Sequence, residues 1–186
     1  PVYDRTLEKI LSSMKALKVG DPRESATDIG PMIDKEKAEE AYRKVKDAEQ
    51  QGARVLIGGE LKESLFEPTV IVDTKPDMRV VREEVFAPVI SVIPYDDFSE
   101  ALRMANAGEF GLQVGIFTQN LNRVMRAFGE MEVGGVIVND IPTFRVDQMP
   151  YGGMKGSGIG REGPRYAIEE MTELRLMVIN RNGGME

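Results

Sequence analysis

The sequence predicts an α/β fold, an open and mostly parallel sheet with helices on both faces. Short runs of β-branched residues alternate with amphipathic helices of about 10–15 residues, which is the pattern of βαβ units. The 186 residues suffice for one domain with a buried core, and their 41% hydrophobic content is ordinary for a globular protein. No internal repeat or low-complexity tract points to another architecture.

The N-terminal part predicts two helices joined by a loop. Apolar residues at helical spacing mark the first helix over residues 3–17, and Gly20 is a suitable stop. Residues 19–32 are interrupted by Gly and Pro and predict a loop. Asp34 is a suitable N-cap for the second helix, which ends at Gly52. The predicted buried stripe of this helix is Ala38, Ala41, Tyr42, Val45 and Ala48.

Four charged residues of the second helix predict two ion pairs. Glu39 lies four residues before Arg43, and Glu40 lies four residues before Lys44. Glu placed N-terminal to a basic residue at this spacing stabilises a helix. We expect both pairs on the outer, solvent-facing side of the helix.

The remaining chain predicts alternating strands and helices. The predicted strands are residues 54–57, 69–72, 88–93, 112–117 and 135–138. The predicted helices cover residues 98–105, 121–128 and 165–171. Asn120 is the expected N-cap of the second of these helices, whose predicted inward residues are Leu121, Val124, Met125 and Phe128. Residues 172–180 follow as a strand-like stretch.

Residues 139–160 form a segment too long for a simple connection, and long loops on rigid scaffolds often carry function. Five glycines lie in it. The Gly156-x-Gly158-x-Gly160 run does not follow a strand that opens a βαβ unit, so it indicates unusual backbone angles and not a dinucleotide fingerprint. Lys155 is not in a Gly-Lys-Ser/Thr context, which excludes a Walker A loop.

Composition excludes several classes of function. The formal charge of −7 and the lack of a dense basic cluster argue against nucleic-acid binding. The absence of His and Cys removes Ser-His and Cys-His nucleophile pairs and the usual zinc ligands, so no metal site is expected. No apolar run reaches the roughly 18 residues of a membrane span, and no signal-peptide pattern begins the chain. We expect a cytoplasmic protein, in keeping with the lack of cysteine.

Four segments, in order, resemble the aldehyde dehydrogenase superfamily. They are Glu83-Glu84-Val85-Phe86-Ala87-Pro88, Ala105-Asn106 followed by Phe110-Gly111-Leu112, Gly134 to Asn139, and the signature from Pro150 to Glu162. Each is moderately specific alone, and the four together at family spacing are strong. Two further matches, at residues 18–22 and 30–31, extend the resemblance over nearly the whole chain.

The resemblance implies an aldehyde-dehydrogenase-like catalytic domain truncated at its N-terminus. The family oxidises an aldehyde to an acid through a Cys thioester, with NAD or NADP as hydride acceptor. It places the nucleophilic Cys, the general-base Glu and the Rossmann domain before the start of this chain. We therefore expect no catalytic residue here beyond an accessory Glu162, and no activity from the isolated chain. The expected partners are the missing N-terminal region and a small aldehyde.

The resemblance assigns the cofactor contacts to Glu84 and Phe86. The second Glu of the motif accepts hydrogen bonds from the nicotinamide ribose hydroxyls, for which a carboxylate has two acceptor oxygens. Phe86 would form a wall beside the nicotinamide; the alternative is an ordinary core Phe. Ala87 departs from the Gly of the family motif, and its Cβ would be costly if φ were positive.

Phe144, Arg145 and Tyr151 are candidate substrate-binding residues. Phe144 and Tyr151 match aromatic positions of the family's substrate tunnel, although both would serve equally to hold the long loop in place. For Arg145 we weigh two roles: recognition of an anionic aldehyde, or a salt bridge at a rim or interface.

The C-terminal residues are assigned to assembly by the same resemblance. Arg161 is expected to pair with Glu173, directly or across a dimer. We divide the chain into residues 1–171, the catalytic-domain portion, and residues 172–186, an oligomerisation strand that adds to a neighbouring subunit's sheet. A homodimer or homotetramer is expected. The alternative function for the chain is a non-catalytic assembly module.

Overall fold

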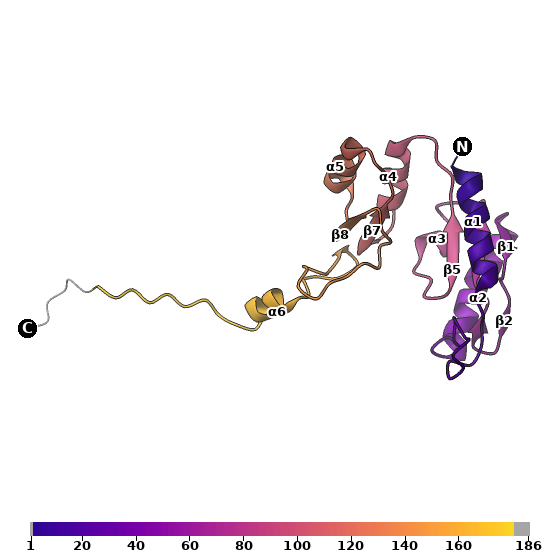
Figure 1. Cartoon of the computed structure of the whole chain (residues 1–186), viewed down its shortest axis with the longest axis horizontal. Helices are drawn as coiled ribbons and strands as arrows, with labels where there is room; N and C mark the ends of the chain where they lie inside the picture. The colour runs from indigo at the N-terminus through magenta and orange to yellow at the C-terminus, as the bar shows by residue number, and fades with distance from the viewer. Residues whose placement is uncertain (1, 181–186) are drawn as a thin grey trace, which may run out of the picture. The chain divides into compact units, whose positions relative to one another are not determined.

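A computed structural model of the chain describes residues 2–180 and confirms a mixed α/β fold with an open sheet (Figure 1). The chain forms two compact units, Pro1–Met104 and Ala105–Glu186. The predicted division between residues 171 and 172 stays a prediction. None of the helices in residues 2–180 is long and apolar enough to cross a membrane.

Unit 1 is built on a three-stranded sheet in the order β1-β4-β5. β4 pairs with β1 antiparallel and with β5 parallel, and β2 and β3 form a separate hairpin. Its elements are α1 (Tyr3–Ala16), α2 (Lys35–Gln50), β1 (Arg54–Ile57), β2 (Leu61–Lys62), β3 (Leu65–Phe66), β4 (Thr69–Val72), α3 (Arg79–Arg82), β5 (Val89–Val92) and α4 (Phe98–Asn106), which extends two residues past the unit boundary.

The core of unit 1 lies between β4 and α2. All four residues of β4 are buried, as expected for a run of β-branched residues in a central strand. The Asp34 side chain accepts a hydrogen bond from the Lys37 amide at 2.7 Å, which confirms the predicted N-cap. The buried residues of α2 include three small ones, Ala38, Ala41 and Ala48. The buried members of this core are Ala41, Val45, Ala48, Ala53, Phe66, Ile71, Met78 and Val80.

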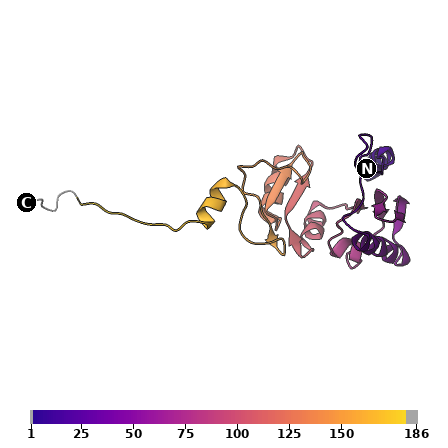
Figure 2. The ribbon, with the colours of Figure 1, turned by 90° about the horizontal axis from the view of Figure 1, so that it is seen from below.

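Unit 2 contains a parallel pair of strands connected through a helix. β7 and β8 run side by side in Figure 2, paired from Gln113 with Gly135 to Ile116 with Val138. β6 and β9 form a short antiparallel pair. The elements of this unit are β6 (Phe110–Gly111), β7 (Gln113–Ile116), α5 (Leu121–Glu130), β8 (Gly135–Val138), β9 (Met154–Lys155) and α6 (Pro164–Glu170).

The predicted inward face of α5 is wrong for three of its four residues. Asn120 does cap the helix by accepting from the Arg123 amide at 3.2 Å. However, Leu121, Met125 and Phe128 are 70%, 62% and 70% exposed. The helix packs through the smaller Ala127, because the two-stranded β7–β8 sheet covers only a narrow strip of it.

Residues 172–180 form no strand within the described chain. The segment is exposed throughout, and its apolar side chains include Leu174, Leu176 and Ile179. A strand requires a neighbouring strand to pair with, and no strand pairing involves residues 172–180 in the part of the chain that the structure describes. Residues 181–186 of the predicted assembly segment lie outside the described residues.

Candidate functional site

The loop between α3 and β5 carries Glu84 and Phe86, the two predicted cofactor contacts. Glu83 anchors the start of this loop. Its carboxylate accepts hydrogen bonds from Nε of Arg79 at 3.1 and 3.2 Å and lies 3.4 Å from Nζ of Lys44. The loop is therefore tied to both α2 and α3 immediately before Glu84.

The hydrogen bond from Arg79 is the main reason that the pKa of the Glu83 carboxyl falls from its ordinary 4.5 to about 2. A carboxyl whose pKa is lower in the folded state stabilises the fold above its unfolded pKa. That contribution is lost as the pH falls from about 4.5 toward 2.

Glu83→Gln is expected to flatten the acid side of the stability profile. Unfolding temperatures measured by circular dichroism between about pH 5 and pH 2 should fall less steeply for Glu83→Gln than for wild type. Glu67→Gln, at an exposed position, is the control and should follow wild type. Parallel profiles for wild type and Glu83→Gln would contradict the role of this carboxylate.

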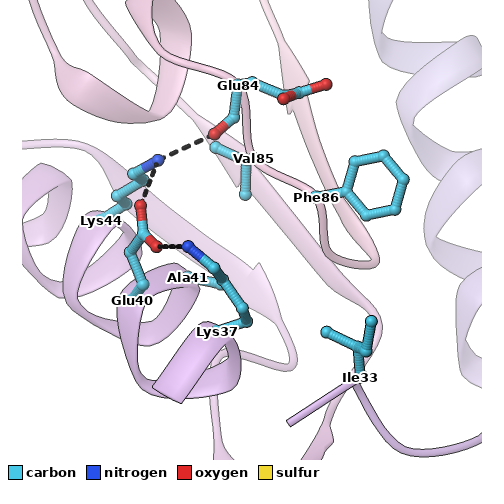
Figure 3. Close-up of a pocket in the computed structure, with 8 residues that line it drawn as sticks. All are labelled: Ile33, Lys37, Glu40, Ala41, Lys44, Glu84, Val85 and Phe86. Carbon is cyan, nitrogen blue, oxygen red and sulfur yellow. Dashed lines mark hydrogen bonds and ion pairs between the residues drawn. The ribbon is translucent and has the colours of Figure 1, made fainter. Parts of the chain in front are cut away.

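A hollow of about 280 Å³ lies between α2 and the loop (Figure 3). Glu84 is exposed, and Figure 3 shows its carboxylate pointing away from α2. Phe86 and Ile33 are 85% and 89% exposed and form an apolar wall. The residues that line the hollow are Ile33, Lys37, Glu40, Ala41, Lys44, Glu84, Val85 and Phe86.

A second hollow of about 570 Å³ shares the same apolar wall. It is lined by Pro31, Met32, Ile33, Val85, Phe86, Ala87 and Pro88. Ala87 is not among the described residues with positive φ, so the Cβ that replaces the family's Gly causes no backbone strain. Phe86 therefore lies at the boundary of two hollows, which an ordinary core Phe would not.

These groups fit the nicotinamide riboside that the resemblance implies. The two oxygens of Glu84 are acceptors suited to a vicinal diol, and the exposed Phe86 ring offers a flat apolar face. Within residues 2–180 we find no cluster of three or more His, Cys, Asp or Glu side chains that could hold a metal ion.

A second cluster, in unit 2, contains three of the other predicted site residues. The Arg145 guanidinium lies 4.3 Å from the centre of the Tyr151 ring, and its Nη2 donates to Glu162 at 2.8 Å. Tyr151 and Glu162 also exchange backbone hydrogen bonds. Phe144 is 46% exposed next to Arg145 in the chain. The Arg145–Glu162 contact is a salt bridge within the chain, and it leaves other guanidinium donors for a ligand.

Arg161 contacts the backbone of its own loop. Its Nη1 donates to the Gly153 and Gly160 carbonyl oxygens at 3.0 and 2.7 Å. Within one copy, no ion pair joins Arg161 to Glu173 in the described chain, since both residues lie in residues 2–180. A pair across two copies stays a prediction.

Two lysines have structural roles that the sequence prediction missed. Lys44 is buried, with 7% of its side chain exposed, so the prediction that it lies on the outer face of α2 is wrong. Its spacing from Ala41 and Ala48 could have indicated this, because it falls on the same helical stripe. Lys155 donates to the Asn106 and Gly108 carbonyl oxygens, both at 2.9 Å, and holds the glycine-rich loop.

Comparison with known proteins places the chain among aldehyde dehydrogenases. The sequence profile described as the aldehyde dehydrogenase family matches residues 1–177. A 3-sulfolactaldehyde dehydrogenase of Priestia aryabhattai is 45% identical over 179 residues, 96% of this chain. The crystal structure of aldehyde dehydrogenase 21 from Physcomitrella patens, in complex with the reaction product succinate, covers 99% of this chain with a TM-score of 0.95 and 44% identity.

A structure of glyceraldehyde-3-phosphate dehydrogenase from Methanocaldococcus jannaschii complexed with NADP covers 91% of this chain, with a TM-score of 0.88 and 40% identity. The chain spans 38% of the length of the Priestia relative and 38% of the Physcomitrella structure. The profile match covers far more than half of the residues. This chain belongs to the aldehyde dehydrogenase family.

Proposed function

We propose that this chain is part of an NAD(P)-dependent aldehyde dehydrogenase, in which it contacts the nicotinamide ribose and shapes the substrate tunnel. The observation that carries the proposal is the anchored loop that holds an exposed Glu84 carboxylate beside the exposed Phe86 ring. The enzyme oxidises an aldehyde to a carboxylic acid in the cytoplasm. We use "full-length protein" for a polypeptide of the relatives' length that carries this chain. In that protein an upstream region supplies the nucleophile, the general base and the main cofactor domain.

In this proposal Glu84 accepts hydrogen bonds from the two hydroxyls of the nicotinamide ribose. Phe86 covers one side of the ring and excludes water from it. When bound, NAD(P)⁺ supplies the hydride acceptor. Holding the ribose fixes the ring relative to the substrate, and such positioning contributes to rate by lowering the entropy cost of reaching the reactive geometry.

The test of this proposal is NAD(P)⁺ reduction by the full-length protein with small aldehydes. The full-length protein should turn over, and the 186-residue chain should not, because it contains no cysteine to attack the carbonyl. Turnover by the 186-residue chain would contradict the proposal that the nucleophile lies in the upstream region.

The second candidate function is an assembly module, and the exposed apolar segment 172–180 favours it. If the chain sedimented as a clean monomer at high concentration, this function would be excluded.

The substrate proposed here is an aldehyde with an anionic group. The names of the relatives include 3-sulfolactaldehyde and aspartate-semialdehyde, each of which carries an anionic group, a sulfonate or a carboxylate, although others are lactaldehyde dehydrogenases. Arg145, stacked on Tyr151, offers donors to a carboxylate or sulfonate, and Phe144 and Tyr151 would line the aldehyde's path.

Arg145→Met in the full-length protein should raise the KM for succinic semialdehyde about 10-fold and leave the KM for propionaldehyde unchanged. A hydrogen bond to a charged group contributes about 1.5–3 kcal/mol, which corresponds to a factor of about 10 or more. Arg165→Met removes a similar surface ion pair, on α6, and serves as the matched control. Equal changes in KM for the two aldehydes would show that Arg145 does not recognise the anionic group and that its role is the salt bridge to Glu162.

A further inference from the structure

Lys44 is an unusual residue in the first hollow because its charged side chain is buried. Only 7% of the side chain is exposed, whereas lysines are rarely buried without partners. It lies on α2, four residues after Glu40 and on the same helical stripe as Ala41 and Ala48. Its charge must therefore be balanced by groups within unit 1.

Three oxygens surround the Lys44 ammonium group. Nζ donates to the backbone carbonyl oxygen of Glu84 at 2.8 Å, and it lies 3.2 Å from Oε1 of Glu40 and 3.4 Å from Oε2 of Glu83. An ammonium group has three N–H donors, so these acceptors match its full capacity. Figure 3 shows the contacts to Glu84 and Glu40.

The shortest of these contacts is to the main chain of the residue that would bind the ribose. The Glu84 backbone lies in a loop, where neither helix nor strand hydrogen bonds hold it. Lys44 reaches it from α2, 40 residues earlier in the chain. The Glu84 carboxylate points away from Lys44 in Figure 3, so its oxygens stay available.

We propose that Lys44 is a positioning residue for cofactor binding: it fixes the Glu84 carbonyl and thereby orients the Glu84 carboxylate toward the nicotinamide ribose. This inference rests on the proposed role of Glu84. In this role Lys44 acts through Glu84 and needs no contact of its own with the cofactor or the substrate. The two acidic partners, Glu40 and Glu83, neutralise its charge and hold it in place for the carbonyl.

Lys44→Met in the full-length protein tests this role. Met keeps much of the side-chain volume and removes the donor and the charge. We expect the KM for NAD(P)⁺ to rise about 10-fold, the factor that the loss of one charge-assisted hydrogen bond implies, with little change in the KM for the aldehyde. The matched control is Lys46→Met, a lysine of the same helix that is ion-paired to Glu49 and Glu60; it should behave as wild type.

Two further variants separate positioning from a merely structural role. Lys44→Arg keeps the charge and the donors, so it should bind NAD(P)⁺ with most of the wild-type affinity. This expectation can be tested even if Lys44→Met folds poorly. The double variant Lys44→Met/Glu84→Gln should show no further rise in the NAD(P)⁺ KM beyond Glu84→Gln alone, because residues that act through one another are not additive.

The outcomes distinguish this inference from the proposed function. If Glu84→Gln leaves the KM for NAD(P)⁺ unchanged, the ribose contact fails and the positioning role fails with it. If Glu84→Gln raises that KM while Lys44→Met behaves like Lys46→Met, the positioning role alone is overturned. It is also overturned if Lys44→Met raises both KM values equally, or if its effect multiplies fully with that of Glu84→Gln.

Discussion

Glu84→Gln in the full-length protein is expected to raise the KM for NAD(P)⁺ about 10-fold, and Glu84→Ala about 100-fold. Gln keeps one acceptor but loses the charge, and Ala loses both acceptors; hydrogen bonds to a charged group contribute about 1.5–3 kcal/mol each. The fold should be unaffected, because the Glu84 side chain is exposed and Lys44 contacts only its backbone. Steady-state kinetics with varied cofactor at saturating aldehyde provide the measurement.

The control for this prediction is Glu67→Gln, which alters an exposed carboxylate elsewhere in unit 1. It should leave both KM values at the wild-type level. If Glu84→Ala changed the KM for NAD(P)⁺ no more than this control does, Glu84 would be an ordinary solvated loop residue.

Gly134→Ala should lower the free energy of unfolding more than any of the other substitutions named above. A Cβ at residue 134 would lie 1.6 Å from the Gly152 carbonyl oxygen and 3.1 Å from that of Leu112. Both neighbours are backbone atoms that cannot rotate away, so we expect a loss of about 3 kcal/mol, the upper end of overpacking costs. The displaced chain leads directly to Tyr151, so the KM for the aldehyde should rise as well. Thermal unfolding and steady-state kinetics of the same sample measure both effects.

Gly129→Ala is the matched control for Gly134→Ala. Gly129 lies in α5, where an added Cβ meets no atom within 4 Å and φ is not positive. Ala at this position should raise stability by about 0.5–1 kcal/mol through its better helix propensity. If both variants were destabilised alike, close backbone packing at Gly134 would not be the cause.

The elements that the sequence predicted well are those whose local pattern agrees with their surroundings. The β-branched run of β4 is buried on both faces, and α2 begins at the Asp34 cap as expected. The two-residue strands β2, β3, β6 and β9 were not predicted, because so short a run has no measurable period. On α5, the pattern correctly marked an apolar face, but what covers a face depends on the rest of the fold and cannot be deduced from the helix alone.

In the candidate site, too, the local sequence pattern identified residues but not their partners in the fold. The motif that contains Glu84 and Phe86 pointed to a loop that the structure holds exposed beside two hollows. Arg145 and Tyr151 could be paired from neither spacing nor propensity, because a loop brings them together. Lys44 reaches the Glu84 carbonyl across 40 residues, and such a contact with the main chain has no signature in the sequence.

The central claim, that Glu84 binds the nicotinamide ribose, is tested most directly with a cofactor analogue that lacks the 2′-hydroxyl of that ribose. Dissociation constants would be measured for NAD(P)⁺ and the analogue with wild-type and Glu84→Ala full-length protein. Wild type should bind the analogue about 10-fold more weakly than the parent cofactor, and Glu84→Ala should bind the two alike. The same preference for the parent cofactor in both proteins would contradict the claim.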